Sequence, residues 1–396
     1  MNRTKAMNPR WIALWALLAS ALIPTTAIDA MGLTLPAIRA YFSVDSHVDM
    51  LTGLVGSAAA FSFAVSAPLM GRVIDRVGYR SVYVASLMLF GIVGAAGGLL
   101  ADLKVLVVSR AVIGVSVAGA LTAGLTGISY LDPVRRGKAL GFHALVGSAG
   151  AMVLFVVVAQ LVGYGWRIAF MVHLLGFLLI PLALALPKHG GARPDERAER
   201  ALSRAGPLFA GVDAKLMATT ALAGIVMFSV PMLAPFYLIG IGVTQPALFA
   251  LPLSIMAFAA MVSAVCYGYV VARMGIAGTF AIGFVLMAAG LGLAGTAGSI
   301  AVFTLGLTLI GASLCMLCPN ISAAAMAGAG GRPGQAVGVT SAILHGVPIV
   351  FPLIVRGGTL GEQPELVFLG FGAAAAFGAG FYMLLCLRRG GLEVRH

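Results

Sequence analysis

The sequence is poor in charged residues. Only 10% of its 396 residues are Asp, Glu, Lys or Arg, whereas 60% are hydrophobic. The mean hydropathy is +1.03. A soluble chain of this length needs a more strongly charged exterior and far less apolar surface. The composition therefore excludes a soluble globular protein and indicates a polytopic membrane protein.

Signatures of catalysis and of nucleotide binding are missing from the sequence. No GxxxxGK[ST] loop is present to hold the phosphates of ATP, and neither HExxH nor GxSxG occurs. We therefore expect no enzymatic activity and no resident cofactor. ATP-driven pumping would lack its nucleotide site on this chain.

Cysteine is scarce, and its four positions lie inside apolar segments. This placement argues against an extracellular disulfide framework. Cys315 and Cys318 have CxxC spacing, but a metal site would need further thiolate or imidazole ligands, and none is evident in that span. We interpret both residues as packing residues and expect no metal.

Acidic residues are also few, at 13 against 25 lysines and arginines, which gives a net charge of +12. In a soluble protein this excess would suggest a nucleic-acid partner. Here most of the basic residues cluster in alternate connections between apolar runs, so we expect no nucleic acid. The positive-inside rule then places both termini in the cytoplasm, which requires an even number of crossings.

Twelve apolar runs are long enough to cross a bilayer, which takes about 20 residues. They should be helices, because lipid offers no partner for free backbone groups. The predicted spans are 11–38, 50–70, 81–101, 105–129, 139–163, 167–187, 214–239, 246–271, 277–297, 299–323, 336–355 and 365–387. The predicted organisation is an N-terminal six-helix bundle (1–187), a cytoplasmic linker (188–213) and a C-terminal six-helix bundle (214–396).

An internal repeat relates the two halves at an offset of 197 residues. Gly71, Arg76 and Gly78 recur as Gly268, Arg273 and Gly275, and residues 135–141 match 332–338 in the same way. Ala272 stands where Asp75 would recur. Parallel repeats are typical of alternating-access carriers, which handle substrate between their halves. A channel or a receptor would not require them.

Two ionisable residues, Asp29 and Arg110, lie well inside predicted spans. Asp29 is ten residues from Arg39, about 15 Å along a helix. Arg110 is six residues from Lys104, about 9 Å along a helix, so the two lie at similar depth. Each costs a few kcal/mol to bury unless it is paired, neutral or facing water. A functional couple, in which Asp29 exchanges a proton and Arg110 tunes its pKa, is one interpretation; a static structural pair is the other.

Three further polar residues are candidates for a cavity within the spans. His345 can titrate near neutral pH, and it can equally serve as an interhelical hydrogen-bond donor. Gln160 and Asn320 are weaker candidates of the same kind.

The stretch GRVIDRVGYR at 71–80 resembles the loop signature of the major facilitator superfamily, Gly-x-x-x-Asp-Arg-x-Gly-Arg-Arg. The likeness covers the whole chain through its six-plus-six topology, RRGKALG (135–141) and GWRIAF (165–170). SRAVIGVSVAGA (109–120) resembles the span 4 signature of the twelve-span drug–proton antiporters, with Arg110 as its buried arginine. Span 5 departs from that group, because it has neither the Gly-Pro nor the paired glycines of their signature.

The resemblance implies an all-α membrane protein of twelve transmembrane helices in two pseudo-symmetric six-helix bundles. It also implies that spans 1 and 4 line a central cavity and that the protein works as a monomer. Charged loop residues would form a latch that closes the inner side; interfacial anchoring is the alternative interpretation of the same residues. The implied latch consists of Gly71, Asp75, Arg76, Gly78, Arg80, Arg135 and Arg136.

We therefore expect a secondary active transporter in the cell membrane, in particular a bacterial inner membrane. Proton-coupled export of a small, fairly apolar compound is the first prediction, because few charged groups lie within the spans. Proton-coupled uptake of a small organic anion or metabolite, with Arg110 pairing its carboxylate, is the alternative. A membrane scaffold or sensor without transport is a hypothesis of another class.

Overall fold

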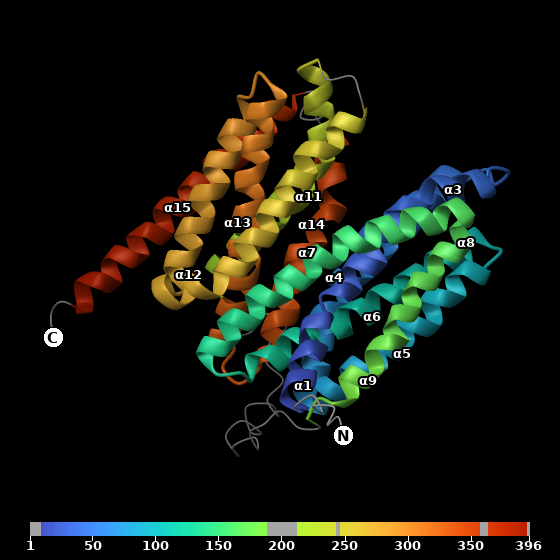
Figure 1. Cartoon of the computed structure of the whole chain (residues 1–396), viewed down its shortest axis with the longest axis horizontal. Coiled ribbons are helices and arrows are strands. Elements are labelled where there is room, and N and C mark those ends of the chain that lie inside the picture. Colours follow the sequence, from blue (N-terminus) through green and yellow to red (C-terminus); the bar gives the residue numbers. More distant parts are fainter. Residues whose placement is uncertain (1–8, 188–211, 243–245, 357–362, 394–396) are drawn as a thin grey trace, which may run out of the picture. The chain divides into compact units, whose positions relative to one another are not determined.

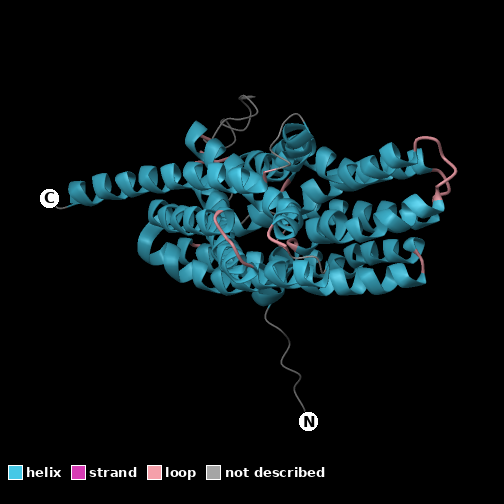
Figure 2. Ribbon diagram, turned by 90° about the horizontal axis from the view of Figure 1, so that it is seen from above, coloured by secondary structure: helices cyan, strands magenta, loops and turns pink. Residues whose placement is uncertain are grey.

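The computed structural model describes residues 9–187, 212–242, 246–356 and 363–393. Within these ranges the regular structure is helical and contains no strand, as the cyan ribbon in Figure 2 shows. A helix satisfies all its backbone hydrogen bonds within one segment, which a lipid environment demands. The prediction of an all-α membrane protein is confirmed.

The helices from α1 to α9 follow one another with short connections (Figure 1). The first span is a series of short pieces: α1 (Pro9–Ala19), α2 (Leu22–Pro24), a π-helical turn (Thr25–Asp29), a 3-10 segment (Ala30–Thr34) and α3 (Leu35–Tyr41). It is followed by α4 (Val48–Val77), α5 (Tyr79–Ala96), α6 (Leu103–Ser129), α7 (Pro133–Tyr164), α8 (Trp166–Ala169) and α9 (Leu175–Leu184). The later helices are α11 (Ala214–Gly240), α12 (Pro246–Gly295), α13 (Ile300–Ala327), α14 (Pro333–Arg356) and α15 (Pro364–Glu393).

Nine helices in the described residues are long and apolar enough to cross a membrane. One of them belongs to α12, which contains two helices joined at Gly275, where φ is 67°. The helices α11 and α14, which are not among the nine, coincide with the predicted spans at 214–239 and 336–355. Together these helices account for the twelve predicted spans.

The second span differs from its prediction, because α4 does not end at residue 70. It continues for two further turns through the charged stretch to Val77. Charged side chains leave the helical backbone bonds intact, so the end of the apolar run did not mark the end of the helix. The helix ends where Gly78 takes a φ of 93°, a conformation that favours glycine. Gly275, its repeat partner, likewise has a positive φ.

The contacts between residues divide the chain into two units. One unit comprises 1–131, 149–212 and 325–342, and the other comprises 132–148, 213–324 and 343–396. Each unit thus includes a short segment from the opposite half of the sequence, and the 197-residue offset maps much of one segment onto the other. The predicted boundaries 1–187, 188–213 and 214–396 stay a prediction, and residues 188–211 of that linker lie outside the described residues.

Close glycine contacts recur in the two units at the repeat offset. A Cβ on Gly114 would lie 2.1 Å from the Ala59 carbonyl oxygen, and one on Gly311 would lie 2.1 Å from that of Met256. Gly311 and Met256 stand 197 residues after Gly114 and Ala59, respectively. Small residues let helix backbones approach one another in membranes. The repeat seen in the sequence therefore reappears as a repeated helix contact.

Replacing Gly311 with Ala is expected to lower the free energy of unfolding by about 1–3 kcal/mol, because the new methyl group meets backbone that cannot move aside. Gly292 is the matched control, since nothing lies within 4 Å of its Cβ position. Gly292→Ala should leave stability unchanged or raise it, because alanine is the better helix former. Thermal unfolding of the detergent-purified variants measures both; equal effects of the two substitutions would contradict the close contact.

Candidate functional site

Arg110 lies on α6 with only 2% of its surface exposed. Its guanidinium donates through Nη2 to the backbone carbonyl oxygen of Ala27, and Nη1 lies 3.4 Å from Nε2 of His173. None of the carboxylate side chains that the structure describes forms an ion pair with it. A buried guanidinium is expensive unless its donors are satisfied. Here the Ala27 carbonyl oxygen and the His173 imidazole accept hydrogen bonds from the guanidinium.

His173 is fully buried, and its two ring nitrogens have different partners. Nδ1 lies 2.9 Å from the Phe170 carbonyl oxygen, which only accepts, so Nδ1 carries the proton. Nε2 is then the unprotonated nitrogen that accepts from Arg110. The Phe90 ring lies 5.0 Å from the imidazole, and Gly94 leaves room for it on α5. His173 is therefore a neutral acceptor held in one orientation.

The first span is irregular where Arg110 meets it. Between Pro24 and Leu35 the chain passes through a π-helical turn and a 3-10 segment. The Thr26 hydroxyl donates to the Leu22 carbonyl oxygen at 2.7 Å. Irregular backbone at membrane depth needs protein partners for its polar groups, and Arg110 supplies one to Ala27. Single π turns are frequent at functional sites.

Asp29 ends the π-helical turn, two residues after Ala27. Its backbone is described, but its side chain is not. The predicted Asp29–Arg110 couple therefore stays a prediction. The structure does connect Arg110 to the Asp29 segment through the Ala27 carbonyl.

The other predicted cavity residues lie elsewhere. Asn320 is fully buried; its amide donates to the Ile276 carbonyl oxygen at 2.8 Å and its Oδ1 accepts from the Tyr267 hydroxyl at 3.4 Å. The side chain of Asn320 thus forms hydrogen bonds with the Ile276 backbone and with the Tyr267 side chain. Gln160 is exposed on α7, and His345 is half-buried on α14. A role for any of the three in a cavity stays a prediction.

Asp75 caps the first turn of α14. Its Oδ1 accepts from the Gly334 backbone N–H and its Oδ2 from that of Gln335, each at 2.9 Å. The first N–H groups of a helix have no partner within it, and a carboxylate there also benefits from the helix dipole. Gly71 permits the approach, because a Cβ on it would lie 2.2 Å from the Gly334 carbonyl oxygen.

The negative charge of Asp75 also affects Tyr130, the residue that follows α6. Partial burial, followed by the Asp75 charge, raises the pKa of Tyr130 above its ordinary value. Tyr130 stacks on Tyr79 with ring centroids 5.7 Å apart. The Tyr130 phenol thus lies within electrostatic reach of the capping carboxylate.

The repeat partner of this cap is built differently. Ala272 replaces the acid, and the first turn of α7 is capped by Asp132, the residue directly before that helix. Asp132 Oδ1 accepts from the Arg135 N–H at 3.0 Å, while its Oδ2 lies 3.2 Å from Arg135 Nε. The two equivalent helix starts therefore each have an acid, one supplied by a distant helix and one supplied locally.

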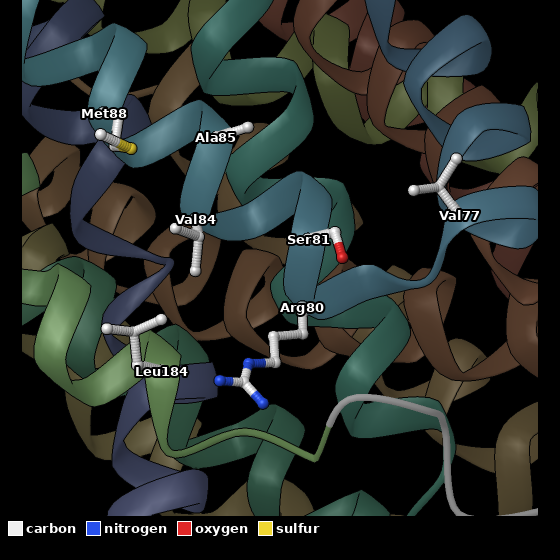
Figure 3. A pocket seen from close by; sticks show the side chains of 7 residues that line it. All are labelled: Val77, Arg80, Ser81, Val84, Ala85, Met88 and Leu184. Atoms are coloured by element: carbon white, nitrogen blue, oxygen red, sulfur yellow. The ribbon is translucent and has the colours of Figure 1, made fainter.

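The remaining residues of the implied latch are spread over different environments. Gly78 forms the turn between α4 and α5. Arg76 is exposed, Arg136 is half-buried, and the Arg80 side chain lies in a groove beside α5 and α9 (Figure 3). Neither Arg76 nor Arg80 forms an ion pair with any residue in the described ranges. Their part in a latch stays a prediction.

Sequence reasoning does not single out His173 or Ala27 as site residues. His173 is one of several histidines in or near the spans, and the sequence does not show which way a helix is turned. Ala27 takes part through its backbone carbonyl. The available signal was indirect: a buried arginine needs acceptors, and span 1 contains a proline shortly before Asp29.

Comparisons with known proteins agree with this architecture. A solved structure of the proton:xylose symporter XylE bound to 6-bromo-6-deoxy-D-glucose matches with a TM-score of 0.77 and 17% identity, covering 96% of each chain. A puromycin resistance protein of Streptomyces alboniger is 30% identical over 43% of this chain and 36% of its own length. A probable sulfoacetate transporter of Cupriavidus necator is 33% identical over 30% of this chain and 28% of its own length. The matched part thus spans about a third of the length of the puromycin resistance protein and of the probable sulfoacetate transporter.

Helices of membrane-crossing length, an internal repeat and a buried arginine bound to an irregular first span define a multi-pass membrane protein. The profile of the Major Facilitator Superfamily matches residues 11–352. The chain belongs to this family.

Proposed function

We propose that this transporter exports a small, fairly apolar compound in exchange for protons, by alternating access. The observation that carries the proposal is the buried Arg110, which binds the irregular backbone of the first span two residues before Asp29. A carboxyl at that depth is protonated readily when it is desolvated and loses its proton readily near a positive charge or water. Such a group can exchange protons as its surroundings change.

The direction of transport is supported by similarity. The puromycin resistance protein is a relative of this chain, and resistance favours export. The apolar character of the spans favours a substrate with little charge. Protons are the proposed coupling ion, and both termini are proposed to lie in the cytoplasm of a bacterial cell.

Uptake of a small organic anion is the second candidate. Its support is the similarity to a probable sulfoacetate transporter and the presence of a buried guanidinium that binds carboxylates and sulfonates well. In this alternative an anion would compete with the Ala27 carbonyl and His173 for Arg110.

Flux into proteoliposomes under an imposed pH gradient tests these proposals. Puromycin and sulfoacetate serve as labelled probes, with empty liposomes as the control. Puromycin movement against an inward proton flow supports export, and sulfoacetate accumulation together with protons supports uptake. Absence of flux for both probes and for a wider panel of small compounds would overturn both proposals and favour a scaffold or sensor.

Asp29→Asn is expected to abolish the dependence of flux on the pH gradient, because an amide cannot exchange a proton at this depth. Counterflow of labelled against unlabelled probe, measured without a gradient, should persist, since it needs no net proton transfer. Flux of the Asn variant that still follows the gradient would remove Asp29 from the coupling step.

A further inference from the structure

A groove of about 500 Å³ runs along the first unit where α4 ends and α5 begins. Its lining combines one cation and one hydroxyl with apolar side chains from α4, α5 and α9 (Figure 3). The lining residues are Val77, Arg80, Ser81, Val84, Ala85 and Met88, together with Leu184. We propose that this groove binds an anionic phospholipid of the surrounding bilayer, with its phosphate on Arg80 and an acyl chain along Val84 and Met88.

The groove begins where close helix packing ends. α5 and α9 touch closely at Gly176, whose Cβ would lie 2.6 Å from the Leu87 carbonyl oxygen, and at Gly91, whose Cβ would lie 2.8 Å from the Phe177 ring. From Met88 toward Arg80 the surface between the two helices is hollow. The small residues thus fix one end of the helix pair, and the groove occupies the other.

The apolar walls face the bilayer. Met88 is 46% exposed and Leu184 is 50% exposed, and both belong to helices that are candidate membrane spans. An exposed apolar side chain on such a helix meets acyl chains rather than water. The occupant of this part of the groove is therefore hydrocarbon.

Arg80 supplies charge complementarity at the end of the groove. It is the second residue of α5, and its side chain extends toward the part of α9 that carries Leu184 (Figure 3). Its guanidinium forms no ion pair or hydrogen bond with any residue in the ranges that the structure describes. An arginine fork matches the oxygens of a phosphate, and the exposed Ser81 hydroxyl can donate beside it.

The depth of the groove fits a lipid. Met88 lies eight residues after Arg80, which is about 12 Å along a helix. Half of the hydrocarbon core of a bilayer is about 15 Å thick. A lipid whose phosphate meets Arg80 at the span end therefore places the first part of a chain beside Met88. A free phosphate would leave the apolar walls unused.

Lipid titration of the delipidated, detergent-purified protein tests this site. Dioleoylphosphatidylglycerol should raise the thermal midpoint more than dioleoylphosphatidylcholine, because ligands that bind the folded state stabilise it. Arg80→Gln should weaken the apparent affinity for dioleoylphosphatidylglycerol about tenfold or more, as expected for losing a charged contact. Arg76→Gln is the matched control, because Arg76 is exposed, lies near the end of α4 and does not line the groove.

A second variant separates lipid binding from any effect of charge. Met88→Trp should fill the apolar part of the groove and reduce binding of dioleoylphosphatidylglycerol while Arg80 is kept. Native mass spectrometry counts the lipids retained by each variant, including any whose midpoint has changed. Equal binding by the Arg80 and Arg76 variants, equal stabilisation by both lipids, or full stabilisation by glycerol phosphate alone would each overturn the proposal.

Discussion

Replacing Arg110 with Met is expected to reduce transport of the labelled puromycin or sulfoacetate probe by about tenfold or more. The change removes a charged donor from the Ala27 carbonyl and from His173 Nε2. Hydrogen bonds to charged groups contribute about 1.5–3 kcal/mol each, and 1.4 kcal/mol corresponds to a factor of ten. Without its partner the irregular first span loses the contact that positions the Asp29 segment.

The thermal midpoint of the Arg110→Met variant should change by no more than about 3 °C. Removing a buried guanidinium relieves its desolvation cost, while two acceptors are left without a donor, and these contributions oppose each other. Loss of transport with a stable fold distinguishes a functional arginine from a structural one. A large fall in the midpoint that accounts for the lost transport would instead assign Arg110 to folding.

His173 provides the matched test of how Arg110 is held. His173→Phe keeps a ring beside Phe90 and Gly94 but removes the Nε2 acceptor. We expect a fall in the maximal rate with little change in the substrate concentration for half-saturation. His173→Gln restores an acceptor at about the same reach and should recover part of the rate. Equal rates for the Phe and Gln variants would show that the acceptor does not matter.

Replacing Asp75 with Asn is the second change with a large expected effect. The amide keeps one oxygen for the Gly334 or Gln335 N–H and turns an NH₂ donor toward the other, so one hydrogen bond and the charge are lost. Hydrogen exchange of the backbone amides at 334 and 335 should therefore accelerate about tenfold. Transport should fall as well, because the start of α14 no longer stays on α4.

Two controls make the Asp75 prediction specific. Asp132→Asn removes the local cap of α7 and should accelerate exchange in the first turn of α7 without affecting α14. Arg76→Gln changes a neighbouring charge that forms no hydrogen bond or ion pair with the described residues of α14, and it should leave exchange unchanged. Protection at 334 and 335 that survives in the Asn variant would show that the cap contributes nothing.

The fold could be predicted from the sequence because lipid restricts the choice so strongly. Apolar runs of membrane length and alternating basic connections indicated the helices, and the 197-residue offset indicated the repeat. The boundary at residue 70 was wrong because hydropathy registers the end of an apolar surface, whereas α4 ends only at the Gly78 turn. Local breaks within the first span were not predicted, since no pattern of hydropathy marks a π-helical turn.

The candidate site was predicted in part. Arg110 could be chosen because a charge inside an apolar span is costly and therefore stands out. Its partners could not, because they depend on helix rotation and on a backbone carbonyl. For Asn320 the sequence did not show its partners either. Its side-chain atoms bind Ile276 and Tyr267, and its role in a cavity stays a prediction.

The Asp132 cap of α7 and the Asp75 cap of α14 should differ in how fast each helix start can separate from its neighbours. When the first turn of α7 moves away from its neighbours, Asp132 moves with it, and the Arg135 amide keeps its acceptor. When the first turn of α14 leaves α4, two amides lose Asp75 and must recruit water before the segment can settle. Under the alternating access proposed above, we expect the separation at α14 to be the slower of two otherwise equivalent steps. Asp75, whose repeat partner is Ala272, would thereby set the rate of a cycle whose two halves are otherwise similar.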